Sequence, residues 1–172
     1  DRWKTPRYGF LLSGSQRRIS LSLNEAVRLL PYKILIRSAD DPAEAEASLA
    51  AVQVIKAGRP DAHVTMLTPL SLTDFWKNCP AVDDVISYQP GSGATEIAKR
   101  IKQAGDFSVG ILFPGHFRAA LEMTLAGVPY RFGPPHRQFL NHWKNAVGAD
   151  DPPAGGPERY RRIAMAAGAR IE

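Results

Sequence analysis

Two loops of the sequence hold residue types that can do chemistry. The first runs from Arg37 to Glu44 and gathers three carboxylates, Asp40, Asp41 and Glu44, in front of an alanine-rich stretch. At a helix start these side chains can cap the helix, because the free N–H groups and the helix dipole favour negative charge there. Alternatively, one of them serves as a general base at the mouth of a cleft.

The second loop reads Phe-Pro-Gly-His-Phe-Arg from Phe113 to Arg118 and leads into another helical stretch. Backbone amides, His116 and Arg118 then lie together at a helix start, which is a favourable place to bind an anion. The alternative is that His116 is an ordinary capping or surface group.

Several common catalytic patterns are missing from the sequence. It has no G-x-G-x-x-G fingerprint, no G-x-S-x-G elbow and no Walker loop. Its single cysteine, Cys79, precedes Pro80 with no helix start or basic partner beside it. The spacing of His136 and His142 near Trp143 fits no zinc ligand pattern. Dinucleotide binding by a glycine loop, covalent catalysis and metal binding are therefore not indicated.

Alternating strands and helices must position the two loops. The periodicity predicts five strands, at Ile34–Arg37, His63–Leu67, Asp84–Ser87, Val109–Phe113 and Tyr130–Phe132. It predicts helices at Pro42–Lys56, Ser71–Asn78, Ala94–Ala104, Phe117–Ala126 and Pro157–Ala167, with Gly127 suited to a left-handed helix end.

Strand alternating with helix predicts an α/β fold, a Rossmann-like doubly wound parallel sheet. The loops after Arg37, Leu67, Ser87 and Phe113 should then hold the functional residues.

Composition agrees with one globular domain plus appendages. The 172 residues are 44% hydrophobic, 9% aromatic and 23% charged, and no apolar run approaches the ~20 residues that span a bilayer. One cysteine excludes an internal disulfide and fits a reducing, cytoplasmic compartment. Because the chain starts at Asp1 rather than Met, we expect it to be cut from a longer protein.

The excess positive charge lies at the start of the chain. Up to Lys33 the chain has seven Lys and Arg against two Asp and Glu, and the remainder has fifteen of each. Residues 1–32 are therefore interpreted as a basic N-terminal extension or linker, within which Ile19–Leu23 resembles a strand and Glu25–Leu30 a short helix. This lead could contact nucleic acid or an anionic membrane. We expect instead a docking arm, since it also carries apolar residues to bury.

The domain organisation follows from these patterns. Residues 33–133 form the predicted Rossmann-like domain. Residues 134–172, rich in proline and glycine before the last helix, are interpreted as an irregular crossing segment and helix toward a missing second domain.

Several stretches in register resemble one family of proteins. They are Lys33–Arg37, Arg59–Leu67, Pro80–Ile86, Ile111–Pro114, Phe117–Leu121, Leu125–Gly133 and the tail Pro157–Tyr160. Together they resemble the N-terminal half of the ADP-heptose:lipopolysaccharide heptosyltransferases, glycosyltransferase family 9. The resemblance runs from about Lys33 to Glu172.

The resemblance implies one half of a two-domain GT-B fold. The N-terminal half receives a lipid-linked saccharide acceptor, and a C-terminal domain absent here holds the nucleotide-sugar donor. It further implies a cytoplasmic protein in peripheral contact with the inner face of the bacterial inner membrane. No metal, no cofactor within this chain and no nucleic acid partner are expected. The isolated chain is expected to be inactive.

The resemblance also assigns roles to residues of the two loops. The family's first loop ends in a Gly-Asp pair, whose Asp is thought to be the general base; here Ala43 and Glu44 take those positions. Glu44 is thus the implied catalytic base, one methylene longer than Asp. The family's Pro-Asn-Ser becomes Pro-Gly-His, which alters the contacts offered to the acceptor. The implied substrate-binding residues are Arg37, Asp40, Asp41, Gly115, His116 and Arg118.

Three functions remain open at this stage. The leading one is the acceptor-side domain of a glycosyltransferase, with Glu44, His116 and Arg118 converging in one cleft. The second is a catalytically degenerate binding or scaffolding module, because the departures fall on the site. A stand-alone nucleotide-binding domain is disfavoured by the missing glycine loop.

Overall fold

A parallel five-stranded sheet forms the centre of the described structure. The computed structural model describes residues 32–134 and 156–166 of the chain. The strands are β1 (Lys33–Arg37), β2 (His63–Pro69), β3 (Asp84–Tyr88), β4 (Val109–Leu112) and β5 (Tyr130–Phe132). Their spatial order is β3-β2-β1-β4-β5, and all pair in parallel. The predicted α/β Rossmann-like fold class is confirmed.

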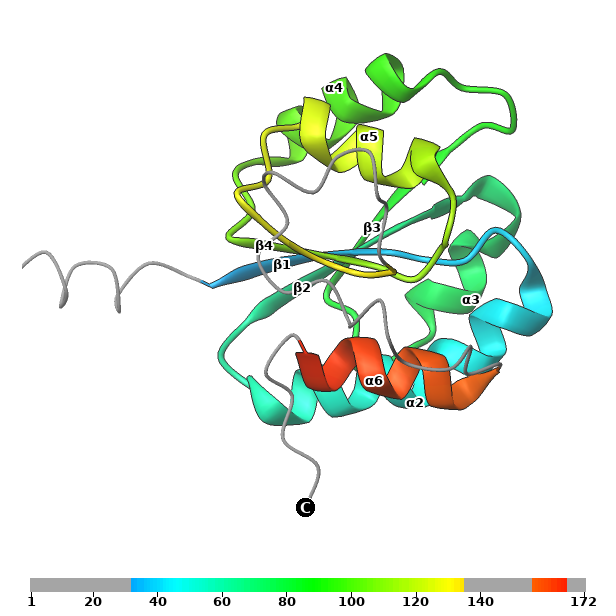
Figure 1. Ribbon diagram of the computed structural model, residues 1–172, viewed down its shortest axis with the longest axis vertical. Coiled ribbons are helices and arrows are strands. Elements are labelled where there is room, and N and C mark those ends of the chain that lie inside the picture. Colours follow the sequence, from blue (N-terminus) through cyan, green and yellow to red (C-terminus); the bar gives the residue numbers. More distant parts are fainter. Residues whose placement is uncertain (1–31, 135–155, 167–172) are drawn as a thin grey trace, which may run out of the picture. The chain divides into compact units, whose positions relative to one another are not determined.

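Helices cover both faces of this sheet (Figure 1). The helices are α2 (Pro42–Gly58), α3 (Thr73–Lys77), α4 (Ala94–Ala104), α5 (Phe117–Leu125) and α6 (Pro157–Ala166), with a 3-10 turn η1 (Leu70–Leu72) before α3. Figure 1 shows α4 and α5 over one face and α2, α3 and α6 over the other. Successive connections therefore use both faces, as in doubly wound sheets.

The central strand β1 explains why the sequence starts this domain with an apolar run. Ile34 and Ile36 face the core shared with α2 and α6, whereas Leu35 faces the core shared with α4 and α5. Alternate side chains of a strand point to opposite faces, so a strand covered on both sides must be apolar throughout. Arg37 ends this strand on the same side as Leu35, and it is 2% exposed.

Helix ends follow local sequence signals. Asp41 caps α2 by accepting hydrogen bonds from two backbone N–H groups of the first turn, and Pro42 occupies the start of the helix. Gly127 follows α5 with a φ of +79°, the left-handed conformation predicted for it.

The predicted elements agree with the structure within a few residues, with one difference of type. The helix predicted for Ser71–Asn78 is a 3-10 turn followed by a short α-helix from Thr73 to Lys77. Strand β2 extends to Pro69, two residues past its predicted end, and the 3-10 turn at Leu70–Leu72 takes the first two residues of the predicted helix. Neither of these two elements has a side-chain N-cap. The basic lead, including the strand and helix predicted in it, and His136, His142 and Trp143 lie outside the described residues.

The last helix belongs to the packed core. Tyr160, Ile163 and Ala164 of α6 are buried in the same cluster as residues of β1 and α2. None of the helices in the described ranges is long and apolar enough to cross a membrane. The domain limits drawn at residues 32, 133 and 172 stay predictions.

Candidate functional site

A pocket of about 490 Å³ opens at the carboxyl end of the sheet. The sheet order places the topological switch point between β1 and β4, where ligands bind in open parallel sheets. The pocket is built from the ends of β1, β2 and β3 and from the segments that follow β1, β2, β3 and β4. Its lining residues are Arg37, Asp40, Pro69, Ser71, Tyr88, Pro90, Gly91, His116 and Arg118.

Asp40 connects the polar groups of this pocket. Its Oδ1 accepts hydrogen bonds from Arg37 Nη1 at 2.9 Å and from the Tyr88 hydroxyl at 2.5 Å. Its Oδ2 lies 3.1 Å from His116 Nε2. The Asp40 side chain is nevertheless 50% exposed, so a ligand can still reach the carboxylate.

These contacts determine the protonation of Asp40 and Tyr88. Partial burial favours a higher pKa for Asp40, but the Tyr88 hydrogen bond and the Arg37 charge outweigh it, and the pKa lies below its ordinary value. Burial raises the pKa of Tyr88, and its hydrogen bond to Asp40 raises it further, against the opposing charge of Arg37. At neutral pH Asp40 is therefore ionised and Tyr88 keeps its proton.

Arg37 supports Asp40 from within the domain. Its Nε donates to Glu122 Oε2 at 2.9 Å, and its Nη1 donates to the Ser38 carbonyl at 2.8 Å as well as to Asp40. The guanidinium also lies 4.7 Å from the centre of the Tyr88 ring. Burial alone would lower the pKa of Arg37, but Glu122, Tyr88 and Asp40 together raise it. Arg37 thus stays charged and fixed by protein contacts.

His116 has a defined tautomer in this arrangement. It is the N-cap of α5, and its Nδ1 accepts a hydrogen bond from the Ala119 N–H at 3.2 Å. A neutral imidazole whose Nδ1 accepts carries its proton on Nε2. His116 therefore donates from Nε2 to Asp40 and does not offer a free basic nitrogen to the pocket.

Arg118 is the more accessible of the two arginines that line the pocket. It is 46% exposed, against 2% for Arg37, and its Nε lies 3.4 Å from the buried Glu122 Oε1. Of the two, Arg118 is the one that a ligand in the pocket can reach, and its predicted contact with an anionic group stays a prediction.

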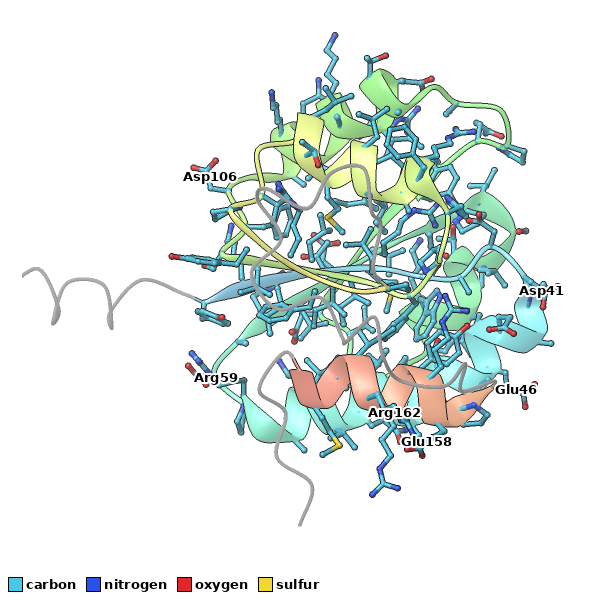
Figure 2. All side chains as sticks on the ribbon, viewed as in Figure 1. Asp41, Glu46, Arg59, Asp106, Glu158 and Arg162 are labelled. Atoms are coloured by element: carbon cyan, nitrogen blue, oxygen red, sulfur yellow. The ribbon has the colours of Figure 1, made fainter. Side chains whose placement is uncertain are left out.

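Two predicted substrate-binding residues lie outside the pocket lining. Asp41 is the N-cap of α2, and its Oδ1 accepts hydrogen bonds from the N–H groups of Ala43 at 3.0 Å and Glu44 at 3.2 Å. Figure 2 shows Asp41 at the start of that helix. Gly115 lies against Arg159 of α6, whose Nη2 would be 3.0 Å from an added Cβ.

The structure does not bring Glu44 into the pocket with His116 and Arg118. Glu44 belongs to the first turn of α2, and its carboxylate accepts a hydrogen bond from the buried Tyr160 hydroxyl. The reason is topological, since α2 and α5 leave the switch point toward opposite faces of the sheet. Asp40 comes before α2 and therefore remains in the loop that lines the pocket at the carboxyl end of the sheet. The general-base role of Glu44 remains a prediction.

The sequence did not single out three residues that contact the candidate site residues, Tyr88, Glu122 and Tyr160, or the lining residues Pro69, Ser71, Pro90 and Gly91. Tyr88 ends β3 next to a loop that the sequence did identify as informative, and Glu122 lies four residues after Arg118 on an otherwise apolar helix face. A hydroxyl at the end of a predicted buried strand and a carboxylate on an apolar helix face are both unusual in a core, so the sequence could have pointed to Tyr88 and Glu122. Tyr160 carried no such signal, because its partner is 116 residues away.

The described residues hold no group of three or more His, Cys, Asp or Glu side chains that could bind a metal ion. The pocket offers the ionised Asp40 carboxylate, the accessible Arg118 guanidinium and the Ser71 hydroxyl, while Tyr88 and His116 donate to Asp40. This set suits a polar ligand with hydroxyl groups.

The fold and the pocket position define the class as a Rossmann-like α/β domain with a switch-point site. No protein-family model matches the sequence, and the comparison with curated proteins finds no match. Solved structures do match the fold.

A structure of E. coli ADP-heptose LPS heptosyltransferase II is similar with a TM-score of 0.63 and 20% identity, over 77% of this chain and 40% of that one. A crystal structure of a family 9 glycosyl transferase from Veillonella parvula is similar with a TM-score of 0.72 and 16% identity, over 81% and 42% of the two chains. At these identities the likeness establishes the shared fold, consistent with one half of a GT-B fold. The chain spans about two fifths of the length of both structures.

Proposed function

We propose that this domain is the acceptor side of a family 9-like glycosyltransferase, which moves a heptose-like sugar from a nucleotide donor to a lipopolysaccharide-core type acceptor. The observation that carries the proposal is the switch-point pocket with an ionised, half-exposed Asp40 between hydrogen-bond donors. The likeness in fold to two glycosyltransferase structures supports it.

The chemistry requires a group that removes a proton from the acceptor. The acceptor hydroxyl forms a new bond to the anomeric carbon of the donor sugar while the bond from that carbon to the nucleotide phosphate breaks. The hydroxyl proton passes to a carboxylate within hydrogen-bond reach. Asp40 offers such a carboxylate in the pocket, and Arg118 can hold an anionic group of the acceptor. The donor would bind a second domain, as the sequence resemblance implies.

Asp40 and Glu44 are now competing candidates for the base. The test compares Asp40→Asn with Glu44→Gln in the protein at its natural length, by transfer of labelled heptose from ADP-heptose to a lipopolysaccharide acceptor. We expect D40N to reduce turnover by about a hundredfold or more, in the range of general base catalysis, and E44Q to stay within a few fold of the parent. The reverse order would return the base role to Glu44.

A second candidate is a binding module that has lost catalysis. Two observations on the carboxylates favour it. The lowered pKa makes Asp40 a weaker base, and the Glu44 carboxylate already accepts a hydrogen bond from the Tyr160 hydroxyl. Titration of the chain with deacylated lipopolysaccharide oligosaccharide, followed by amide NMR shifts, separates the candidates. Binding at the pocket without any transfer in the first assay identifies the module; neither binding nor transfer contradicts both.

The location follows as part of the proposal. A lipid-linked acceptor and a nucleotide-sugar donor meet at the cytoplasmic face of the inner membrane. The protein is then expected there, in peripheral contact with the membrane surface.

A further inference from the structure

The first turn of α6 contacts both segments that flank the pocket. Arg159 Nη2 donates to the Phe113 carbonyl at 2.9 Å, at the end of β4. Tyr160 follows it and packs its ring edge-to-face against the Phe113 ring at 5.0 Å between centroids. Both rings are buried, so α6 is tightly packed against the start of the loop that carries His116.

Among the described residues, the other contacts of this loop lie at its two ends, Phe113 and His116. Phe113 N–H bonds to the Arg37 carbonyl as the last rung between β4 and β1. Pro114 has no N–H group to donate, and Gly115 has no side chain to pack. The Arg159 guanidinium lies against Gly115, within 3.0 Å of the place where a Cβ would be. The Arg159 guanidinium thus contacts the segment between its two ends, the Phe113 bond to β1 and the His116 cap of α5.

The same turn also holds the other loop. The Tyr160 hydroxyl donates to the carboxylate of Glu44, three residues after Asp41 and four after Asp40. Helix α6 therefore braces the start of α2 as well as the end of β4. These are the segments that place Asp40 and His116 3.1 Å apart.

We propose that Arg159 is a positioning residue of the pocket. It keeps the His116 loop in the position in which His116 Nε2 lies within hydrogen-bond distance of Asp40. The inference rests on the proposed function for its consequence, acceptor binding, but its structural part can be measured separately. Arg159 itself is not among the residues that line the pocket.

The test uses Arg159→Met, which keeps the side-chain stem and removes the donor, in the complete chain. Arg161→Met is the matched control, because Arg161 is an exposed arginine on the same helix. The first readout is the tautomer of His116 from the ¹⁵N shifts of its ring. The second is the dissociation constant for deacylated lipopolysaccharide oligosaccharide.

We expect the parent and R161M to show the Nε2–H tautomer alone. In R159M a shifted loop would move His116 relative to both groups that select this tautomer, the Ala119 N–H and the Asp40 carboxylate, so a mixture of both tautomers is expected. Affinity for the saccharide should fall about tenfold or more in R159M, since a misplacement of about 1 Å is costly at such sites. Arg159→Lys, which can still donate, should recover part of both signals. A stability loss alone would leave the His116 tautomer unchanged.

The outcomes separate this inference from the proposed function. If R159M keeps a single tautomer, Arg159 does not position His116 and the inference is overturned. If R159M shows a mixture of tautomers but the parent binds no saccharide, the positioning role of Arg159 is supported and the proposed function is rejected. Should R159M fail to fold, Arg159→Gln carries the same test, because it keeps a polar side chain that is too short to place a donor where Nη2 meets the Phe113 carbonyl.

Discussion

Asp40 is the residue on which the site depends, because it is ionised, accessible and held at three points. Tyr88, Arg37 and His116 each contribute a hydrogen bond to it. Arg37 is itself fixed by the buried Glu122, so the network extends from the pocket into the core. A buried charge pair of this kind keeps its geometry at the cost of desolvation.

The charge of Asp40 predicts a pH dependence of stability. Because its pKa in the folded state is below the ordinary value of 3.8, its contribution to the free energy of unfolding is fully present above that value and is lost as the pH falls through the folded pKa. We expect D40N to be less stable than the parent at neutral pH, with the difference shrinking below about pH 4. Urea unfolding at several pH values measures it.

Asp106→Asn is the control for this experiment, because it removes an exposed carboxylate in the turn before β4 (Figure 2). A stability difference between parent and D40N that stays constant down to about pH 2 would contradict the assignment.

At the scale of elements, the two helices that start at the switch point determine what enters the pocket. Helix α5 begins at Phe117, directly after the His116 cap, and keeps Arg118 at the pocket. Helix α2 begins at Pro42 and carries Glu44 toward α6. Capping by Asp41 and by His116 fixes where each helix starts, and thus which side chains stay in the loops.

The packing of α6 is tested by a pair of substitutions. Ile163 is 2% exposed in the core shared with α2, whereas Met165 of the same helix is 52% exposed. We expect Ile163→Ala to lower the free energy of unfolding by about 2–5 kcal/mol. Met165→Ala should change it by less than about 0.5 kcal/mol. Equal, small effects of both substitutions in denaturant titrations would mean that α6 does not pack on this face.

At the scale of the whole molecule, the net charge of +5 calls for a test of nucleic-acid binding. We expect no micromolar affinity for a DNA duplex at about 150 mM salt, because the basic lead also carries apolar residues suited to docking, and non-specific electrostatic binding weakens steeply with salt. Fluorescence anisotropy of a labelled duplex measures the affinity, with a titration at about 50 mM salt as the reference. Micromolar binding that persists at the higher salt would overturn the docking interpretation.

The sequence alone predicted the order and type of nearly all the described elements, because apolar periodicity, caps and helix-ending glycines act over a few residues. It also predicted that the loop after the first strand meets the loop of His116 and Arg118, since parallel strands end at one edge of the sheet, but it named Glu44 rather than Asp40 as the carboxylate that meets them. The largest difference is at the start of α3, Thr73–Lys77, where no side chain caps the helix.

Tertiary structure alone decided which carboxylate occupies the pocket. Asp40 and Glu44 are four residues apart, and nothing local separates them until α2 turns to the face opposite α5. The contacts that fix each one come from distant parts of the chain: Tyr88 lies 48 residues from Asp40, and Tyr160 lies 116 residues from Glu44. Such pairings depend on how the two layers of helices close over the sheet, and no pattern of neighbouring residues encodes them.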